Sequence, residues 1–153
     1  VTDMSKIESK SIDVINAIEL FEHVENIEKG LMECSRVLKE SGIMILSIPF
    51  LFPVHADPND FQRWTDKKWE NDLTKRGFKI EKLEIMGRYF TIIMEMKKTL
   101  IKKLPLGISY VFMLFYPFLD LLVKLDNVSY IINGLGLEGY HQGYFIICRK
   151  SNF

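Results

Sequence analysis

An apolar strand, an amphipathic helix and a second apolar strand follow one another over residues 11–49, and this order constrains the fold more than any other feature. Residues 11–17 are rich in isoleucine and valine, which predicts a buried strand. Apolar residues at three- and four-residue steps predict one face of a helix: Val24, Ile27, Leu31, Cys34 and Leu38. Gly42 is expected to terminate that helix in the left-handed conformation. Residues 43–49 form a continuous apolar run typical of a central strand, so the unit implies a right-handed crossover and a parallel pair.

The rest of the chain continues this pattern. Thr65 is expected to cap a helix, with Trp64 and Trp69 forming a hydrophobic staple across the cap and Gly77 ending the helix. Residues 78–86 alternate apolar and charged side chains, which predicts either a strand with one solvent-exposed face or an edge strand, and residues 143–149 predict the last strand. Between these two strands, residues 87–142 form an apolar, mostly helical insertion.

Composition sets the class of protein. The 153 residues suffice for a single domain over residues 1–153. Twenty basic residues balance twenty acidic ones, which argues against a nucleic-acid partner. Cys34 and Cys148 lie in apolar segments and are expected to be buried thiols, so a reducing compartment is favoured. The amino terminus lacks the pattern of a secretory signal, and we therefore expect a cytoplasmic location.

The segment SIDVINAIELFEHVENIEKGLMECSRVLKESGIMILSIPF resembles class I S-adenosylmethionine-dependent methyltransferases of the type 11 kind. The similar features are a strand with an Asp near its start, a Leu-Glu-His-type turn, a helix ending in Arg-Val-Leu, a glycine, and a strand running into Pro-Phe. The spacing of His55, Asp57-Pro58, Asp60-Phe61 and Arg63-Trp64-Thr65 is similar to a subgroup linked to polysaccharide or lipid-glycan gene sets. The resemblance covers residues 1–86 and 143–150 well and the insertion loosely.

The resemblance implies an α/β fold: part of a three-layer, Rossmann-like methyltransferase sheet, mostly parallel, with an antiparallel terminal strand and a helical insertion. It also implies transfer of a methyl group from S-adenosylmethionine to a small-molecule or glycan acceptor. The alternative is a catalytically silent methyltransferase-like module that serves as an interaction or membrane-docking partner.

The cofactor S-adenosylmethionine would meet only part of the family's site in this chain. The glycine-rich turn and the ribose-binding acidic residue would precede Val1, so the chain is expected to bind the cofactor weakly or not at all. By resemblance, Asp3 stands near the adenine contact, and Asn16, Ala17 and Ile18 pass beside the methionine portion.

Two groups of polar residues are candidates for catalysis. Glu19 and His23 are four residues apart and are expected to share a helix face, where they could hydrogen-bond and place the imidazole of His23 near the cleft. His55, Asp57 and Asp60 could accept a proton from a substrate hydroxyl. Arg63 could clamp a phosphate or carboxylate, although it could instead pair with Asp60. The pattern favours these roles over a metal site, and no metal is expected.

Two surfaces are expected to have partners. Residues 104–123 are strongly apolar and follow four lysines, which predicts a helical hairpin at an interface or contact with a membrane surface, so the protein could be peripheral to a membrane. The strand at residues 11–17 would lack a neighbour on one side. We expect a second copy of the chain, or another segment or partner chain, to cover that edge.

Overall fold

The computed structural model describes residues 1–55 and 59–151. Two compact units result from the contacts along the chain. The first comprises Val1–Glu84 together with the segment from Gly143 to the carboxyl terminus, and the second is Ile85–Gln142. The second unit corresponds closely to the expected insertion.

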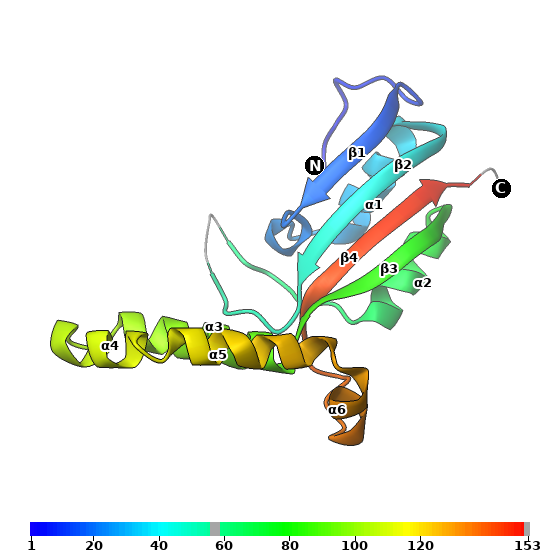
Figure 1. Cartoon of the computed structure of the whole chain (residues 1–153). Coiled ribbons are helices and arrows are strands. Elements are labelled where there is room, and N and C mark those ends of the chain that lie inside the picture. The colour runs from blue at the N-terminus through cyan, green and yellow to red at the C-terminus, as the bar shows by residue number, and fades with distance from the viewer. Residues whose placement is uncertain (56–58, 152–153) are drawn as a thin grey trace. The chain divides into compact units, whose positions relative to one another are not determined.

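The first unit is built on a four-stranded sheet with the order β1-β2-β4-β3 (Figure 1). Its elements are β1 (Ile12–Ile18), the 3-10 helix η1 (Phe21–His23), α1 (Ile27–Val37), β2 (Leu38–Pro49), α2 (Asp66–Lys75), β3 (Phe78–Arg88) and β4 (His141–Lys150). β1 and β2 are parallel, and β4 is antiparallel to β2. The amide of Ser151 donates to the carbonyl of Gly77 at 2.7 Å, which places the end of β4 beside the start of β3. The expected parallel pair and antiparallel terminal strand are therefore confirmed.

One face of this sheet carries the core. Figure 1 shows α1 and α2 on the same face of the sheet. The paired residues Ala17 and Leu46 point to that face and are almost fully buried. Val14 and Ile18 alternate with Ala17 along β1, and they are 52% and 48% exposed. Among the described residues, β1 is thus an edge strand with a buried face and an open face. The expectation that a partner covers this edge stays a prediction.

Gly42 does not terminate α1, which corrects the sequence-based expectation. The helix ends at Val37, and Leu38 is already extended. The left-handed residue in this region is Ser41, with φ 63°. Gly42 is required for space, because a Cβ there would lie 2.9 Å from the carbonyl oxygen of Lys39 and 3.1 Å from that of Asp13. Close approach of backbone inside β2 therefore explains this glycine.

The expected start and end of α2 are confirmed. The Thr65 side chain accepts a hydrogen bond from the amide of Lys68. The rings of Trp64 and Trp69 lie 4.8 Å apart, as a staple across the cap requires. Gly77 follows the helix with φ 80°, the left-handed conformation that favours glycine. The loop that precedes Thr65 is therefore held at a defined entry to the helix.

The second unit is helical, with α3 (Tyr89–Lys102), α4 (Leu106–Met113), α5 (Tyr116–Val123), η2 (Lys124–Asn127) and α6 (Ser129–Gly134). Asp126 in η2 fastens the start of α3, because its carboxylate accepts hydrogen bonds from the amides of Phe90 and Thr91, each at 2.9 Å. The expectation of a hairpin within residues 104–123 is wrong in detail. α4 and α5 both contact α3, so the chain reverses between α3 and α4.

Candidate functional site

The candidate site lies where β1 and β2 end. Parallel strands bring their carboxyl ends to the same edge of a sheet, and open α/β sheets bind ligands at such an edge. β1 leads into η1, and β2 leads into a loop of which the structure describes residues 50–55 and 59–65. The amide of Phe61 donates to the carbonyl of Glu22 at 2.9 Å, and the side-chain amide of Gln62 donates to the carbonyl of Val24 at 2.7 Å. These bonds hold the loop against η1 and bring distant side chains together.

Two predicted residues, His23 and His55, meet at this edge. Their ring centroids are 5.0 Å apart with nearly perpendicular planes. The Nδ1 of His23 lies 2.5 Å from the carbonyl oxygen of Asn59. The Nδ1 of His55 lies 3.2 Å from the carbonyl oxygen of Pro53. A carbonyl only accepts, so Nδ1 donates in both rings, and in the neutral form of each ring the lone pair lies on Nε2.

Asp60 and Arg63 form an ion pair beside the imidazoles. Both guanidinium Nη atoms donate to the carboxylate, with a distance of 2.6 Å from Nη2 to Oδ2. Asp60 also accepts from the amide of His55 at 3.1 Å. The hydrogen bonds from Arg63 lower the pKa of the Asp60 carboxyl to about 2. Asp60 is therefore a weak base that positions the loop. Asp57, the remaining predicted member, lies outside the described residues.

Glu19 is placed differently from the expectation, which is corrected here. It precedes η1 and shares no helix face with His23. Its φ is 47°, a left-handed conformation that costs a non-glycine residue about 1–2 kcal/mol. The carboxylate accepts from the Ser47 hydroxyl at 2.5 Å, and the Glu19 amide donates to the Ser47 carbonyl at 2.9 Å. These bonds from β2 hold the strained residue at the end of β1.

Glu22 is a candidate site residue that the sequence reasoning missed. It is fully buried, and no other described residue donates a hydrogen bond to either carboxylate oxygen. The Nε2 of His23 lies 3.7 Å from Oε1. Burial raises the pKa of the Glu22 carboxyl, and the charge of Glu19 adds to this, although the amide of Glu22 itself, His23 and Arg63 oppose it. The only signal in the sequence is its position next to His23.

The predicted cofactor residues divide between two faces of β1 and the amino terminus. Asn16 and Ile18 are exposed at the carboxyl end of the strand. The Ala17 side chain is buried in the helical face, so Ala17 could offer only its backbone to a ligand. The Asp3 carboxylate accepts from the amide of Ser5 at 3.0 Å. An open edge with exposed groups fits a ligand that lies across the end of β1.

A cavity of about 500 Å³ adjoins this edge. It is lined by Val1, Thr2, His23, Val24, Glu25, Asn26, Lys29 and Phe61. Asn26 caps the start of α1, since its side chain accepts from the amide of Lys29 at 2.9 Å. The cavity therefore connects the amino-terminal segment with the imidazole of His23.

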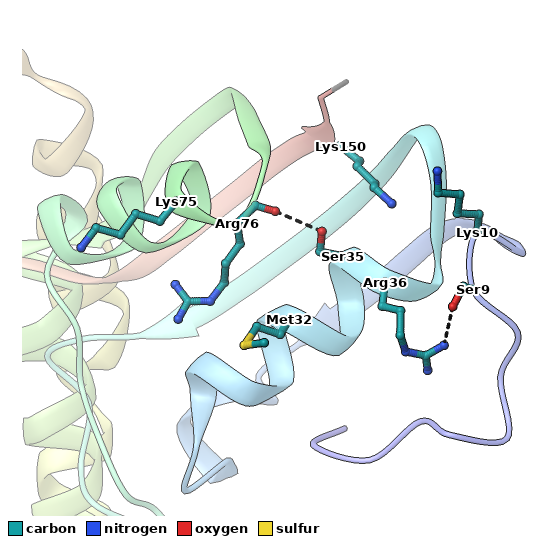
Figure 2. Close-up of a pocket in the computed structure, with 8 residues that line it drawn as sticks. All are labelled: Ser9, Lys10, Met32, Ser35, Arg36, Lys75, Arg76 and Lys150. Carbon is teal, nitrogen blue, oxygen red and sulfur yellow. Dashed lines mark hydrogen bonds between the residues drawn. The ribbon is translucent and has the colours of Figure 1, made fainter. Parts of the chain in front are cut away.

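A second cavity, of about 780 Å³, lies at the opposite end of the sheet (Figure 2). It is lined by Ser9, Lys10, Met32, Ser35, Arg36, Lys75, Arg76 and Lys150. Its cations are largely neutralised within the protein. Arg36 donates to Glu33, to Ser9 and to the carbonyls of Met4 and Ile7, and Lys10 pairs with Glu40 at 2.8 Å. This cavity is at the starts of β1 and β2, so we assign the functional edge to the His23 side.

Comparison with known proteins identifies the fold. A family model described as a methyltransferase domain matches residues 1–46. No curated protein matches the chain in sequence. Solved structures of methyltransferases share its fold.

A proposed sarcosine dimethylglycine methyltransferase from Galdieria sulphuraria has a TM-score of 0.58 and 18% identity over 99% of this chain and 57% of its own. Phosphoethanolamine N-methyltransferase 2 from Haemonchus contortus has a TM-score of 0.55 and 17% identity over 95% of this chain and 35% of its own. The [4+2]-cyclase SpnF has a TM-score of 0.57 and 12% identity over 99% of this chain and 54% of its own. The chain therefore spans between about a third and three fifths of the length of these proteins, and it has the α/β fold of class I S-adenosylmethionine-dependent methyltransferases.

Proposed function

We propose that the protein transfers a methyl group from S-adenosylmethionine to a hydroxyl group of an acceptor, with a saccharide or a lipid-linked glycan as the acceptor class. The observation that carries this proposal is the cluster of His23, His55 and Glu22 at the carboxyl edge of β1 and β2, within a methyltransferase fold. This edge is where open α/β sheets bind their ligands.

The chemistry needs few side chains. In the transfer, an acceptor oxygen forms a bond to the methyl carbon as the carbon–sulfur bond breaks, and the hydroxyl proton leaves to a base. Proximity and alignment supply most of the acceleration in such displacements. Arg63 holds the pKa of Asp60 to about 2, so a lone pair on an imidazole is the better proton acceptor at neutral pH. We assign that role to His23 or His55.

The cofactor is proposed to lie across the open end of β1. Ile18 and Val14 are on the same strand and the same face, and they are 48% and 52% exposed, but only Ile18 is at the carboxyl end. Ile18→Lys is therefore expected to weaken cofactor binding, whereas Val14→Lys serves as its matched control. Saturation-transfer NMR with S-adenosylhomocysteine suits a weak complex and reports binding without turnover.

The proposed cofactor edge is supported if magnetisation is transferred to S-adenosylhomocysteine from the native protein and from Val14→Lys but not from Ile18→Lys. An equal saturation-transfer signal in all three proteins contradicts the placement of the cofactor at Ile18. Absence of a saturation-transfer signal with the native protein contradicts cofactor binding by this chain and favours the silent module.

The silent, membrane-docking module is the second candidate, and the helical unit favours it. Residues Gly107–Asn127 form a helical stretch of 21 residues that is long and apolar enough to cross a bilayer by length and composition. Leu114 is 79% exposed and Phe118 is 63% exposed. The basic residues just before this stretch, Lys97, Lys98, Lys102 and Lys103, suit an anionic surface. We propose peripheral contact of a cytoplasmic protein with a membrane through residues 104–123.

Co-sedimentation with anionic phosphatidylserine vesicles tests this contact. The double variant Leu114→Asp, Phe118→Asp is expected to lose binding, because two charges would enter the acyl region. Tyr130→Asp, in α6 and at a residue that is 88% exposed, is the control for an added surface charge. Binding that is equal in the double variant and the control, or absent in the native protein, would remove the membrane proposal.

A further inference from the structure

We propose that Glu22, His23 and His55 form a binding site for one divalent transition-metal ion. Each residue offers one ligand atom, and these three atoms lie within 4.8 Å of one another. Two of the residues come from η1 and one from the loop after β2, so the fold itself brings the donors together. The sequence pattern did not favour a metal here, whereas the geometry does.

The spacing of the donors suits a small ion after modest side-chain rotation. Metal–nitrogen and metal–oxygen bonds of about 2.0–2.2 Å set tetrahedral ligand atoms roughly 3.4 Å apart. Starting from 4.8 Å at most, contraction by up to about 1.4 Å brings all three into the coordination sphere. The imidazoles are 17% and 39% exposed, which leaves one side of the site open to solvent.

Both histidines are oriented as metal ligands usually are. Ligating histidines commonly donate their second ring N–H to a backbone carbonyl or a carboxylate, which fixes the tautomer. His23 has such a partner in the Asn59 carbonyl at 2.5 Å. His55 has the Pro53 carbonyl at 3.2 Å and the Asp60 carboxylate at 3.3 Å. The Nε2 lone pairs are therefore the ones available for coordination.

Glu22 supplies the independent observation that points to a cation. A fully buried carboxylate without donors is costly, because burial removes its hydration without replacement. The Nη atoms of Arg63 are bonded to Asp60. Glu19 brings a second negative charge near Glu22, which the charges of His23 and Arg63 oppose only in part, since the pKa of the Glu22 carboxyl stays raised. An ion bound by Glu22 would supply the missing positive charge and offset this repulsion.

The donor set indicates the class of ion. Mg²⁺ and Ca²⁺ prefer oxygen ligands, whereas two imidazoles and one carboxylate suit Zn²⁺, Co²⁺ or Fe²⁺. Three protein ligands leave at least one coordination position open. If the proposed methyl transfer holds, on which this role rests, an acceptor oxygen would occupy that position and lose its proton more readily. With both Nε2 lone pairs bound to the ion, that proton would leave to solvent, and the ion would take the place of the free imidazole in promoting deprotonation.

Cobalt binding by the metal-free protein tests the site without any turnover. The protein is stripped with a chelator and titrated with Co²⁺ while visible absorption is followed. We expect one Co²⁺ per chain and a d–d spectrum that reports nitrogen ligands. Glu22→Gln, His23→Gln and His55→Gln should each weaken binding by at least tenfold, and Glu25→Gln, which changes an exposed neighbouring carboxylate, should leave it unchanged.

A stability measurement keeps the test valid if a variant folds poorly. Glu22→Gln removes a buried charge, so without metal its melting temperature should be no lower than that of the native protein. Saturating Zn²⁺ should raise the melting temperature of the native protein and of Glu25→Gln, but not that of Glu22→Gln. Absence of Co²⁺ binding, or binding that none of the three variants weakens, overturns the site. Methyl transfer that persists after chelation overturns only the role assigned to the ion.

Discussion

Asp72 gives the sharpest prediction about stability in the first unit. Its carboxylate is almost fully buried in α2 and accepts hydrogen bonds from Lys68 and from Arg76, the latter at 2.9 Å. The Lys68 side chain is 41% exposed and that of Arg76 is 13% exposed. We therefore count the Arg76 bond at about 2 kcal/mol and the Lys68 bond at about 0.5 kcal/mol. The side-chain oxygen of an asparagine could still accept a hydrogen bond and retain part of this stabilisation, so Asp72→Asn should lower the free energy of unfolding by about 2 kcal/mol.

The pH dependence of this effect has a definite sign. Burial alone would raise the pKa of the Asp72 carboxyl, but the hydrogen bonds from Lys68 and Arg76 outweigh it and lower that pKa. The stabilisation is therefore complete above the unfolded pKa, about 3.9, and is lost as the pH falls through the lower folded pKa. The difference between native protein and Asp72→Asn should shrink below about pH 4.

Urea unfolding followed by tryptophan fluorescence measures this difference, because Trp69 is buried in the same helix. Glu70→Gln is the matched control. Glu70 pairs with Lys67 in α2, but both side chains are well exposed, so its loss should cost less than about 0.5 kcal/mol. The reasoning would be refuted if Asp72→Asn lowered the free energy of unfolding by no more than Glu70→Gln does. It would also be refuted if the decrease in Asp72→Asn grew as the pH falls.

Two further predictions concern a glycine and the cysteines. Gly42→Ala should destabilise the protein by about 1–3 kcal/mol, because the added Cβ would lie too close to backbone oxygens. Gly107→Ala, whose added Cβ would meet only open space, should be neutral or stabilising. Equal urea midpoints for the two variants would contradict this argument. Burial raises the pKa of the Cys34 thiol to about 11 and that of Cys148 to about 12, so neither should react with a disulfide reagent at pH 8 until urea unfolds the protein. Rapid labelling of the folded protein would show that a thiol is accessible.

Local patterns were sufficient to predict much of the fold. Periodicity identified the strand, helix and strand before Pro49, and turn chemistry identified Thr65 and Gly77 at the ends of α2. Gly42 was interpreted wrongly because a glycine after a helix usually caps it, whereas here the backbone of Asp13, far away in the sequence, sets the requirement. The reversal between α3 and α4 was also missed, since the apolar pattern of residues 104–123 does not indicate which helix it packs against.

The site was predictable only in part. His23, His55, Asp60 and Arg63 were chosen by residue type and by their position after strands, and the structure brings them to one edge. Glu22 could not be found in this way, because its burial arises only in the folded protein, where the Phe61 amide, distant in sequence, donates to the Glu22 carbonyl. A charged residue stands out as a candidate only when tertiary packing buries it away from solvent, and local sequence patterns do not indicate that burial.

The position of β1 at the edge of the sheet has a consequence for hydrogen exchange. Successive residues of a strand direct their amides alternately toward the neighbouring strand and away from it. β1 pairs with β2 on one side. Along Ile12–Ile18, amides that face β2 should exchange slowly and the intervening ones quickly, giving an alternating profile. Pairing of a further strand along this edge would protect the fast amides and make the profile uniform, so exchange rates at seven consecutive residues report directly whether β1 has a second neighbour.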